Sequence, residues 1–118
     1  MKAFQWLKRR FNHEINPYTV SCKAVFRNVD KTLVMYVRSD VPTLVTGLKA
    51  SERKLNSVAR TTDREKLNEA ALYFARAIFQ DEGERLVEFY DNPAATISAL
   101  GMFFDKQLKQ KITEAQKA

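Results

Sequence analysis

The sequence has few of the residues that carry cross-links or metal chemistry. Its 118 residues include one cysteine and one histidine. Cys22 has no second thiol to pair with, and its place in an alternating apolar pattern predicts a small buried side chain in a reducing compartment. His13 has no second histidine one helical turn away, so the pattern of a helical zinc site is missing.

The patterns of common catalytic and phosphate-binding sites are missing as well. The three glycines, at positions 47, 83 and 101, lie too far apart for a glycine-rich phosphate loop, and no serine has a histidine partner other than His13. Four acidic residues form a cluster that is typical of a solvated helix face, because a catalytic carboxylate needs burial: Asp81, Glu82, Glu84 and Glu88. We therefore expect a protein that is not an enzyme and that uses no metal or cofactor.

No apolar run approaches the ~18 residues that a membrane-spanning helix requires. The first residues, MKAFQWLKRRF, carry positive charge but lack the apolar region of about 7 to 15 residues that defines a signal peptide. These absences predict a soluble, cytoplasmic protein without a membrane partner.

Acidic residues are scarce in the first half of the chain. The net charge of +6 arises from 12 Lys and Arg against 4 Asp and Glu in residues 1–60, and 8 against 10 in residues 61–118. This asymmetry indicates either an anionic partner such as nucleic acid or attraction between the two halves or two copies of the chain. A nucleic-acid partner and a homo-oligomer are therefore both open alternatives.

Residues 1–16 predict a basic amphipathic arm, because Phe4, Leu7 and Phe11 recur at helical spacing among lysines and arginines. Such an arm is typical of a segment that docks on a membrane surface or a partner, and equally of a helical turn anchored on the domain by its aromatic residues. We take Trp6 as a candidate partner-binding residue.

The apolar pattern changes to period two in residues 17–38, which predicts an antiparallel β-hairpin around the turn-prone segment NVDK. One register pairs apolar residues across the strands on a single face: Phe26 with Leu33, Ala24 with Met35 and Cys22 with Val37. Because an isolated hairpin is marginally stable, helices are expected to cover that face.

Helical periodicity fills residues 41–117. The first helix is expected to begin with Pro42 in its first position. Thr62 and Glu65 form a capping box at the start of the second helix, and Gly83 indicates a break before a short third helix. These elements predict one α+β domain over residues 1–118, an N-terminal antiparallel hairpin packed against a bundle of three to four α-helices.

The last helix is expected to start at an Asn92 cap, with Pro93 in the first position. Five apolar residues make one continuous stripe: Ile97, Leu100, Phe104, Leu108 and Ile112. Met102 and Phe103 widen this stripe, which predicts that the first half of the helix is enclosed on two sides.

A basic stripe is predicted on the first helix, where Lys49, Arg53 and Arg60 line up with Asn56 at spacings of three and four. Such a stripe is suited to phosphates, but it is equally typical of a solvated face when no glycine-rich loop or interleaved aromatic residue accompanies it. We keep the three basic residues as candidate partner-binding residues.

The run from ALYFARAIFQDEGERLVEFYDNP to GMFFDKQLKQKITEAQK resembles the C-terminal half of small proteins encoded in the tail-morphogenesis region of siphophages and prophages of Gram-positive bacteria. The resemblance covers about half of the chain. It rests on Phe74, Ala75, Ile78, Phe79, the run Glu88 to Asp91, and the residues Lys111, Ile112, Thr113, Ala115, Gln116 and Lys117. The family has glycine and a further acidic residue before the proline, where this chain has only Asn92.

The resemblance implies a tail assembly chaperone in the bacterial host cytoplasm, which masks the aggregation-prone tape-measure protein until tail-tube subunits replace it. Such a protein needs an exposed apolar surface, used by helix-in-groove binding or by β-augmentation along the hairpin edge. Val25 and Val34, opposite each other on the outer hairpin face, are the candidate contacts. The alternatives are a small basic nucleic-acid-binding protein and a structural head or tail completion protein.

Overall fold

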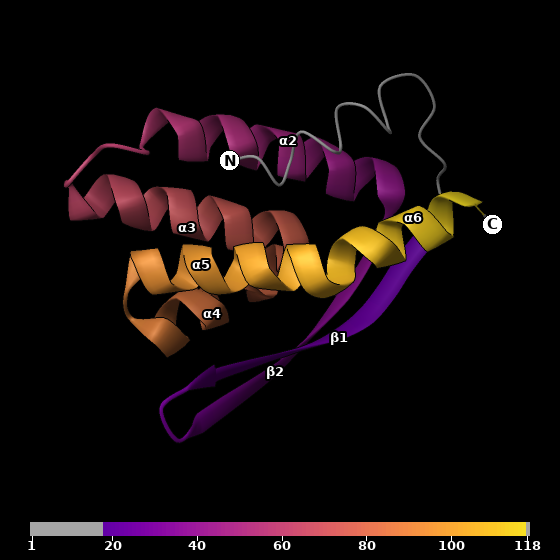
Figure 1. Cartoon of the computed structure of the whole chain (residues 1–118), viewed down its shortest axis with the longest axis horizontal. Helices are drawn as coiled ribbons and strands as arrows, with labels where there is room; N and C mark the ends of the chain where they lie inside the picture. Colours follow the sequence, from indigo (N-terminus) through magenta and orange to yellow (C-terminus); the bar gives the residue numbers. More distant parts are fainter. Residues whose placement is uncertain (1–17, 118) are drawn as a thin grey trace.

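The computed structural model describes residues 18–117, so the predicted arm and Trp6 lie outside the described residues. The elements are, in chain order, β1 (Thr19–Asn28), β2 (Lys31–Asp40), α2 (Val41–Ser57), α3 (Arg64–Phe79), η2 (Gln80–Glu82), α4 (Gly83–Tyr90), α5 (Pro93–Phe103), η3 (Phe104–Leu108) and α6 (Lys109–Lys117). The helices lie on one side of the hairpin, which crosses beneath them (Figure 1). The predicted α+β class, a hairpin followed by helices, is confirmed.

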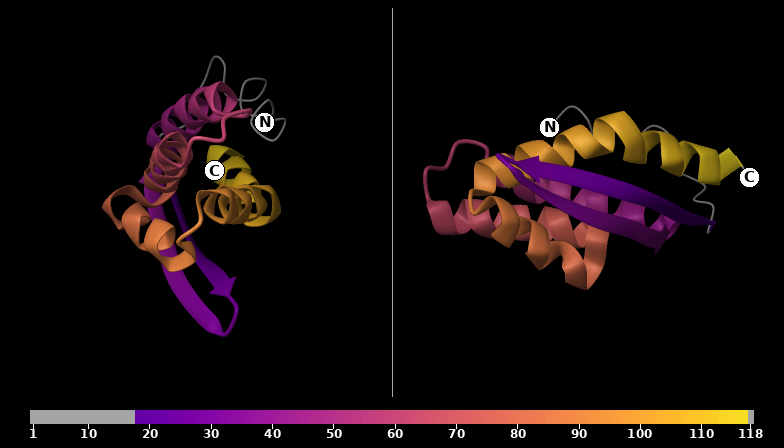
Figure 2. Two further views of the ribbon diagram at one scale, coloured as in Figure 1. Left: turned by 90° about the vertical axis from the view of Figure 1, so that its left-hand side faces the viewer. Right: turned by 90° about the horizontal axis from the view of Figure 1, so that it is seen from below.

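The hairpin has the predicted register, with Phe26 opposite Leu33 and Ala24 opposite Met35. Residues on the inner face of the two strands are buried or half-buried, and those on the outer face are exposed, as the alternating sequence pattern requires. The pairing continues to Thr19 and Asp40, so β2 is two residues longer than predicted. The turn end of the hairpin lies outside the helical layer (Figure 2).

Asp40 joins β2 to α2 by capping the helix. Its carboxylate accepts hydrogen bonds from the backbone N–H of Thr43 at 2.9 Å and from the Thr43 hydroxyl at 2.7 Å. The hydroxyl bond, followed by the N–H bond, holds the pKa of Asp40 below its usual range. Because this cap immediately precedes Val41, the helix begins there, and the prediction that it begins at Pro42 is wrong by one residue.

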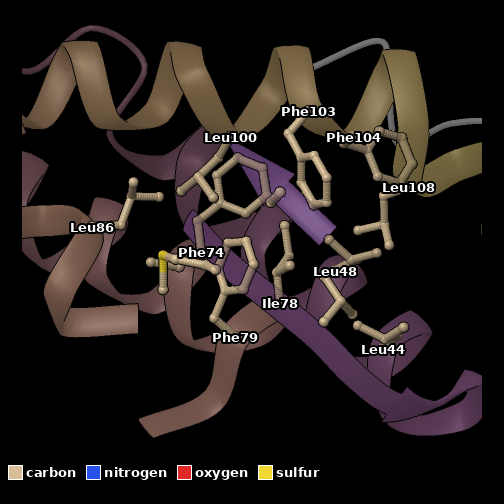
Figure 3. Packing of buried hydrophobic residues seen from close by; sticks show 14 of the residues in the cluster. Leu44, Leu48, Phe74, Ile78, Phe79, Leu86, Leu100, Phe103, Phe104 and Leu108 are labelled. Carbon is tan, nitrogen blue, oxygen red and sulfur yellow. The ribbon is translucent and has the colours of Figure 1, made fainter. Parts of the chain in front are cut away.

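The core lies between the inner hairpin face and the helices. Phe74, Leu100 and Phe104 are fully buried, and Val20 and Met35 contribute from the strands. Figure 3 shows the side chains of α2, α3, α4, α5 and η3 converging on this region.

Three aromatic rings tie the hairpin to two helices. Phe26 of β1 meets Phe79 of α3 and Phe103 of α5 edge-on, with ring centroids 5.8 and 5.9 Å apart. Phe79 and Phe103 stack at 5.8 Å. These separations lie in the favourable range for aromatic pairs, so the ring cluster fixes the distal half of the hairpin against the helical layer.

The cap of α3 differs from the predicted capping box. Asp63, not Thr62, is the N-cap, and its carboxylate accepts from the N–H of Glu65 at 3.0 Å. Asp and Thr are both good N-cap residues, and here the chain places the carboxylate at the helix start. The predicted break near Gly83 is confirmed, because the 3₁₀ turn η2 separates α3 from α4.

The last helical segment contains a π-helical turn, η3, that the sequence analysis did not predict. In an α-helix each four-residue step turns by about 40° beyond a full circle, so three such steps would carry Ile112 about 120° away from Leu100. A π turn contains about one extra residue and takes back roughly 100°. Leu100, Phe104, Leu108 and Ile112 are all fully buried as a result.

The prediction that Met102 widens the buried face is wrong, since its side chain is 53% exposed, whereas Phe103 is buried as predicted. Met102 therefore belongs to the surface of α5.

Within the part of the chain that the structure describes, none of the helices has the length and apolarity needed to cross a bilayer.

Candidate partner-binding surface

The outer face of the hairpin exposes apolar side chains. Val25 and Val34 are directly paired across the strands and are 44% and 37% exposed. Tyr36, two residues along β2 on the same face, is 59% exposed. These three residues are named here the outer apolar patch.

Basic residues surround this patch. Lys23 lies opposite Tyr36, while Arg27 and Arg38 lie further along the same face of β1 and β2. All three are exposed, and none of them forms an ion pair with another residue of the 18–117 range. Among the described residues of the two strands, Asp40 at the end of this face is the only acidic one there, and it caps α2. The face therefore combines apolar contact area with uncompensated positive charge.

A groove of about 380 Å³ runs beside β1, between that strand and the α5–η3 segment. Its walls include Val25, Tyr90, Ala99, Met102, Phe103 and Lys106. We call it the edge groove. Val25 belongs to both the edge groove and the outer apolar patch, so the two features form one continuous surface.

Two other grooves lie among the helices. One of about 460 Å³ between α2 and α3 has charged walls, and in it the Lys54 ammonium lies 5.4 Å from the ring centre of Tyr73. A smaller one of about 340 Å³ lies where the end of α2 meets the starts of α3 and α5, with Leu55 and Ile97 in its walls. Neither is bordered by a strand edge, and the edge groove is the one that joins the outer apolar patch.

The predicted basic stripe is not a helix stripe. Helix α2 ends at Ser57 with Val58 as its C-cap, so Arg60 lies in the following turn. Lys49 and Arg53 are on α2, which belongs to the helical layer, away from the outer hairpin face (Figure 1). The structure thus does not bring these basic residues together with Val25 and Val34.

The remaining candidates for chemistry have ordinary structural environments. Burial raises the pKa of the half-buried Cys22 thiol, with Lys111 acting in the opposite direction, so the neutral thiol is favoured. In the acidic cluster, Glu84 pairs with Arg76 and Glu82 pairs with Arg85 on the exposed surface. Among residues 18–117, no three His, Cys, Asp or Glu side chains are placed to hold a metal ion.

Sequence reasoning found Val25 and Val34 but missed Tyr36, Lys23 and Met102. The signal for Tyr36 was available, because it shares the odd-even phase of Val34 in β2 and must lie on the same face. The signal for Met102 was available as well, because a residue two positions after the buried Leu100 lies about 200° around the α-helix and faces away from the core.

Comparison of the chain with protein-family models, curated proteins and solved structures found no match.

Proposed function

We propose that this chain is a non-enzymatic phage or prophage tail-morphogenesis protein, an assembly chaperone that binds and masks the tape-measure protein during tail assembly. The observation that supports the proposal most directly is the outer apolar patch of Val25, Val34 and Tyr36, exposed on a sheet face that the described helices leave open. A masking protein needs such a surface because it must cover apolar segments of its client. The resemblance of the C-terminal half supplies the identity of the client.

The test is co-expression with the tape-measure protein of the same tail region, with the soluble yield of that protein as the measurement. The wild-type chain should raise the soluble yield. Tyr36→Glu, which places a charge in the outer apolar patch, should remove most of the gain. Tyr73→Glu is the matched control, since Tyr73 is a similarly exposed tyrosine, 42% against 59%, on α3. An unchanged yield with the wild-type chain would count against the proposal.

One observation favours a second function, binding of single-stranded nucleic acid. On the outer hairpin face Lys23 lies opposite an exposed aromatic ring, Tyr36, and Arg38 is the next residue of β2 on the same face. Cations around an aromatic residue form the usual platform for stacked bases and phosphates. This function predicts binding to an oligonucleotide that weakens steeply as salt rises. Lack of binding at ~50 mM salt, where phosphate contacts are strong, would eliminate it.

A further inference from the structure

The hydrogen-bonding phase of the hairpin determines which backbone groups of β1 point away from β2. The Tyr18 carbonyl accepts from the N–H of Val41 at 3.0 Å, so these two residues form a bonded pair. Bonded and non-bonded pairs alternate along an antiparallel ladder. By this alternation, the even-numbered residues of β1 bond to β2, and the N–H and C=O of Lys23, Val25 and Arg27 point outward.

A contact of α4 agrees with this phase. Burial raises the pKa of Tyr90, and a hydrogen bond with the backbone of Arg27 offsets part of that rise. This contact places the Tyr90 hydroxyl beside Arg27, whose N–H the ladder phase directs away from β2. The α4 end also holds the last residue of β1, since the Asn28 side-chain amide donates to the Phe89 carbonyl at 3.0 Å.

The strand edge is therefore covered by α4 near the turn and open at Val25. No backbone hydrogen bond from Val25 to another element occurs within residues 18–117, and the edge groove lies beside it. An open strand edge next to an apolar groove offers both the main-chain bonds and the side-chain pocket that strand addition needs.

The chemistry of the walls specifies the side chains of an added strand. Successive side chains of a strand point to opposite sides. One set would enter the edge groove and meet Ala99, Met102 and Phe103, which favours apolar residues. The other set would lie beside the outer face, near Lys23 and Arg27, which favours Asp and Glu.

We propose that the edge groove binds an extended segment of a partner protein as a third strand, hydrogen-bonded to Lys23 and Val25 of β1, with alternating apolar and acidic side chains. The paired valines and Met102 favour a peptide over nucleic acid, because aliphatic side chains give bases no stacking surface. The segment differs from an amphipathic helix, which satisfies its own backbone and gains nothing from the open edge. The identity of the partner as the tape-measure protein rests on the proposed function, whereas the mode of binding does not.

The probe is a fluorescein-labelled ten-residue peptide of alternating Glu and Val, measured by fluorescence anisotropy with the full chain. We expect saturable binding that weakens as salt screens Lys23, Arg27 and Lys106. The same peptide with alternate backbone nitrogens methylated should bind at least about tenfold more weakly, since it loses the N–H groups of one edge. Equal binding of the two peptides would overturn the proposal.

Proline substitution tests the strand edge directly. Val25→Pro removes an N–H that points into the edge groove and leaves the ladder with β2 intact, and it should weaken binding at least about tenfold. Val34→Pro is the matched control, because Val34 is the directly paired valine and its N–H points to the opposite edge. It should bind within about threefold of the wild-type chain. Equal losses in two folded variants would overturn the proposal.

Another variant tests the edge groove without a proline, so its result does not depend on whether the proline variants fold. Met102→Glu places a negative charge in the wall of the edge groove at a side chain that is 53% exposed, so the fold should tolerate it and peptide binding should fall. Normal peptide binding by a folded Met102→Glu chain would overturn the proposal.

The two proposals fail separately. If the wild-type chain rescues the tape-measure protein and Val25→Pro rescues it equally, the strand-addition mode is wrong and the chaperone function stands. If the peptide binds at the β1 edge but the tape-measure protein stays insoluble, the function is wrong and the binding mode stands. If an oligonucleotide binds without displacing the peptide, the strand-addition proposal stands. If the wild-type chain binds no peptide at all, the strand-addition proposal is refuted.

Discussion

Gly83 is the residue at which adding one methyl group should destabilise the fold most strongly. It begins α4 with an ordinary helical conformation, φ −57° and ψ −31°, so its backbone does not require glycine. The requirement is steric. A Cβ at this position would lie 2.7 Å from the carbonyl carbon of Ala75, 2.7 Å from the backbone nitrogen of Arg76 and 2.9 Å from the Ala75 oxygen. All three atoms belong to the backbone of α3 and cannot rotate away.

The magnitude follows from two opposing terms. Favourable carbon contacts lie near 3.5–4.0 Å, so Gly83→Ala must push α4 away from α3 by roughly 1 Å. Overpacking that moves backbone costs about 1–3 kcal/mol, and the gain in helix propensity on replacing glycine returns about 0.8–1 kcal/mol. We expect a net loss of up to about 2 kcal/mol, which lowers the melting temperature of a domain of this size by up to roughly 10 °C.

Thermal unfolding followed by circular dichroism measures this loss, and Gly47→Ala is the matched control. A Cβ at Gly47 would meet the Ala77 Cβ at 3.1 Å, a side-chain contact that can relax by a few tenths of an ångström. The propensity gain should then offset the contact and leave stability within about 0.5 kcal/mol of the wild-type value. A Gly83→Ala chain that melts at or above the wild-type temperature would refute the packing argument.

Four further changes test the local geometry. Val29 has φ 57° and is 98% exposed, so Val29→Gly should stabilise the chain in urea titrations by about 0.5–1 kcal/mol, because glycine adopts this conformation without strain. Asp40→Ala should lower the melting temperature at pH 7. Because the pKa of Asp40 is depressed in the folded chain, its carboxylate stabilises the fold above the unfolded-state pKa of about 3.9, and this stabilisation is lost as pH falls through the folded-state pKa. The melting temperatures of the wild-type and Asp40→Ala chains should therefore converge in acid. Deletion of Gln107 should be tolerated, because it removes the extra residue of the π turn. Deletion of Ser98 should lower the free energy of unfolding by more than about 3 kcal/mol, because it turns Leu100 roughly 100° away from the core.

The elements that follow from local rules could be predicted from the sequence. Alternation in β1 and β2 gave both the hairpin and its register, because a shift of one residue would turn every apolar side chain to the solvent. The N-cap of α5 and the break before α4 followed from Asn92 and Gly83. The predicted helix starts were wrong by one residue at two places. At α3 two good N-cap residues, Thr62 and Asp63, are adjacent, and at α2 the strand continues into the helix without a loop, at Asp40 and Val41.

The π turn is the main structural feature that periodicity did not predict. Its signal was present, since Leu100, Phe104, Leu108 and Ile112 are four residues apart, a spacing that drifts around an α-helix by about 40° per step. A stripe with that spacing can stay buried only if the helix widens or bends, and the choice depends on tertiary contacts that the sequence does not show.

The candidate surface was predictable only in part, for a physical reason. A sequence indicates which side chains share a face, and so Val25 and Val34 were placed correctly. It does not indicate which strand edge the helices cover, because that depends on how α4 and α5 cross the hairpin. Tyr90 and Asn28 close the β1 edge near the turn, and the direction of α5 then leaves Met102 at the open part.

The covered and open parts of β1 have different consequences for association. Exposed strand edges promote pairing between chains, and proteins usually restrict it by covering the edge or placing charges along it. In this chain α4 covers the end of the edge, and Lys23 and Arg27 flank the part that stays open. Positive charges on both sides repel a second copy of the same edge, since antiparallel pairing of two β1 strands would bring these cations together. They attract an acidic strand, so the same residues that oppose self-association through β1 select the charge of the partner.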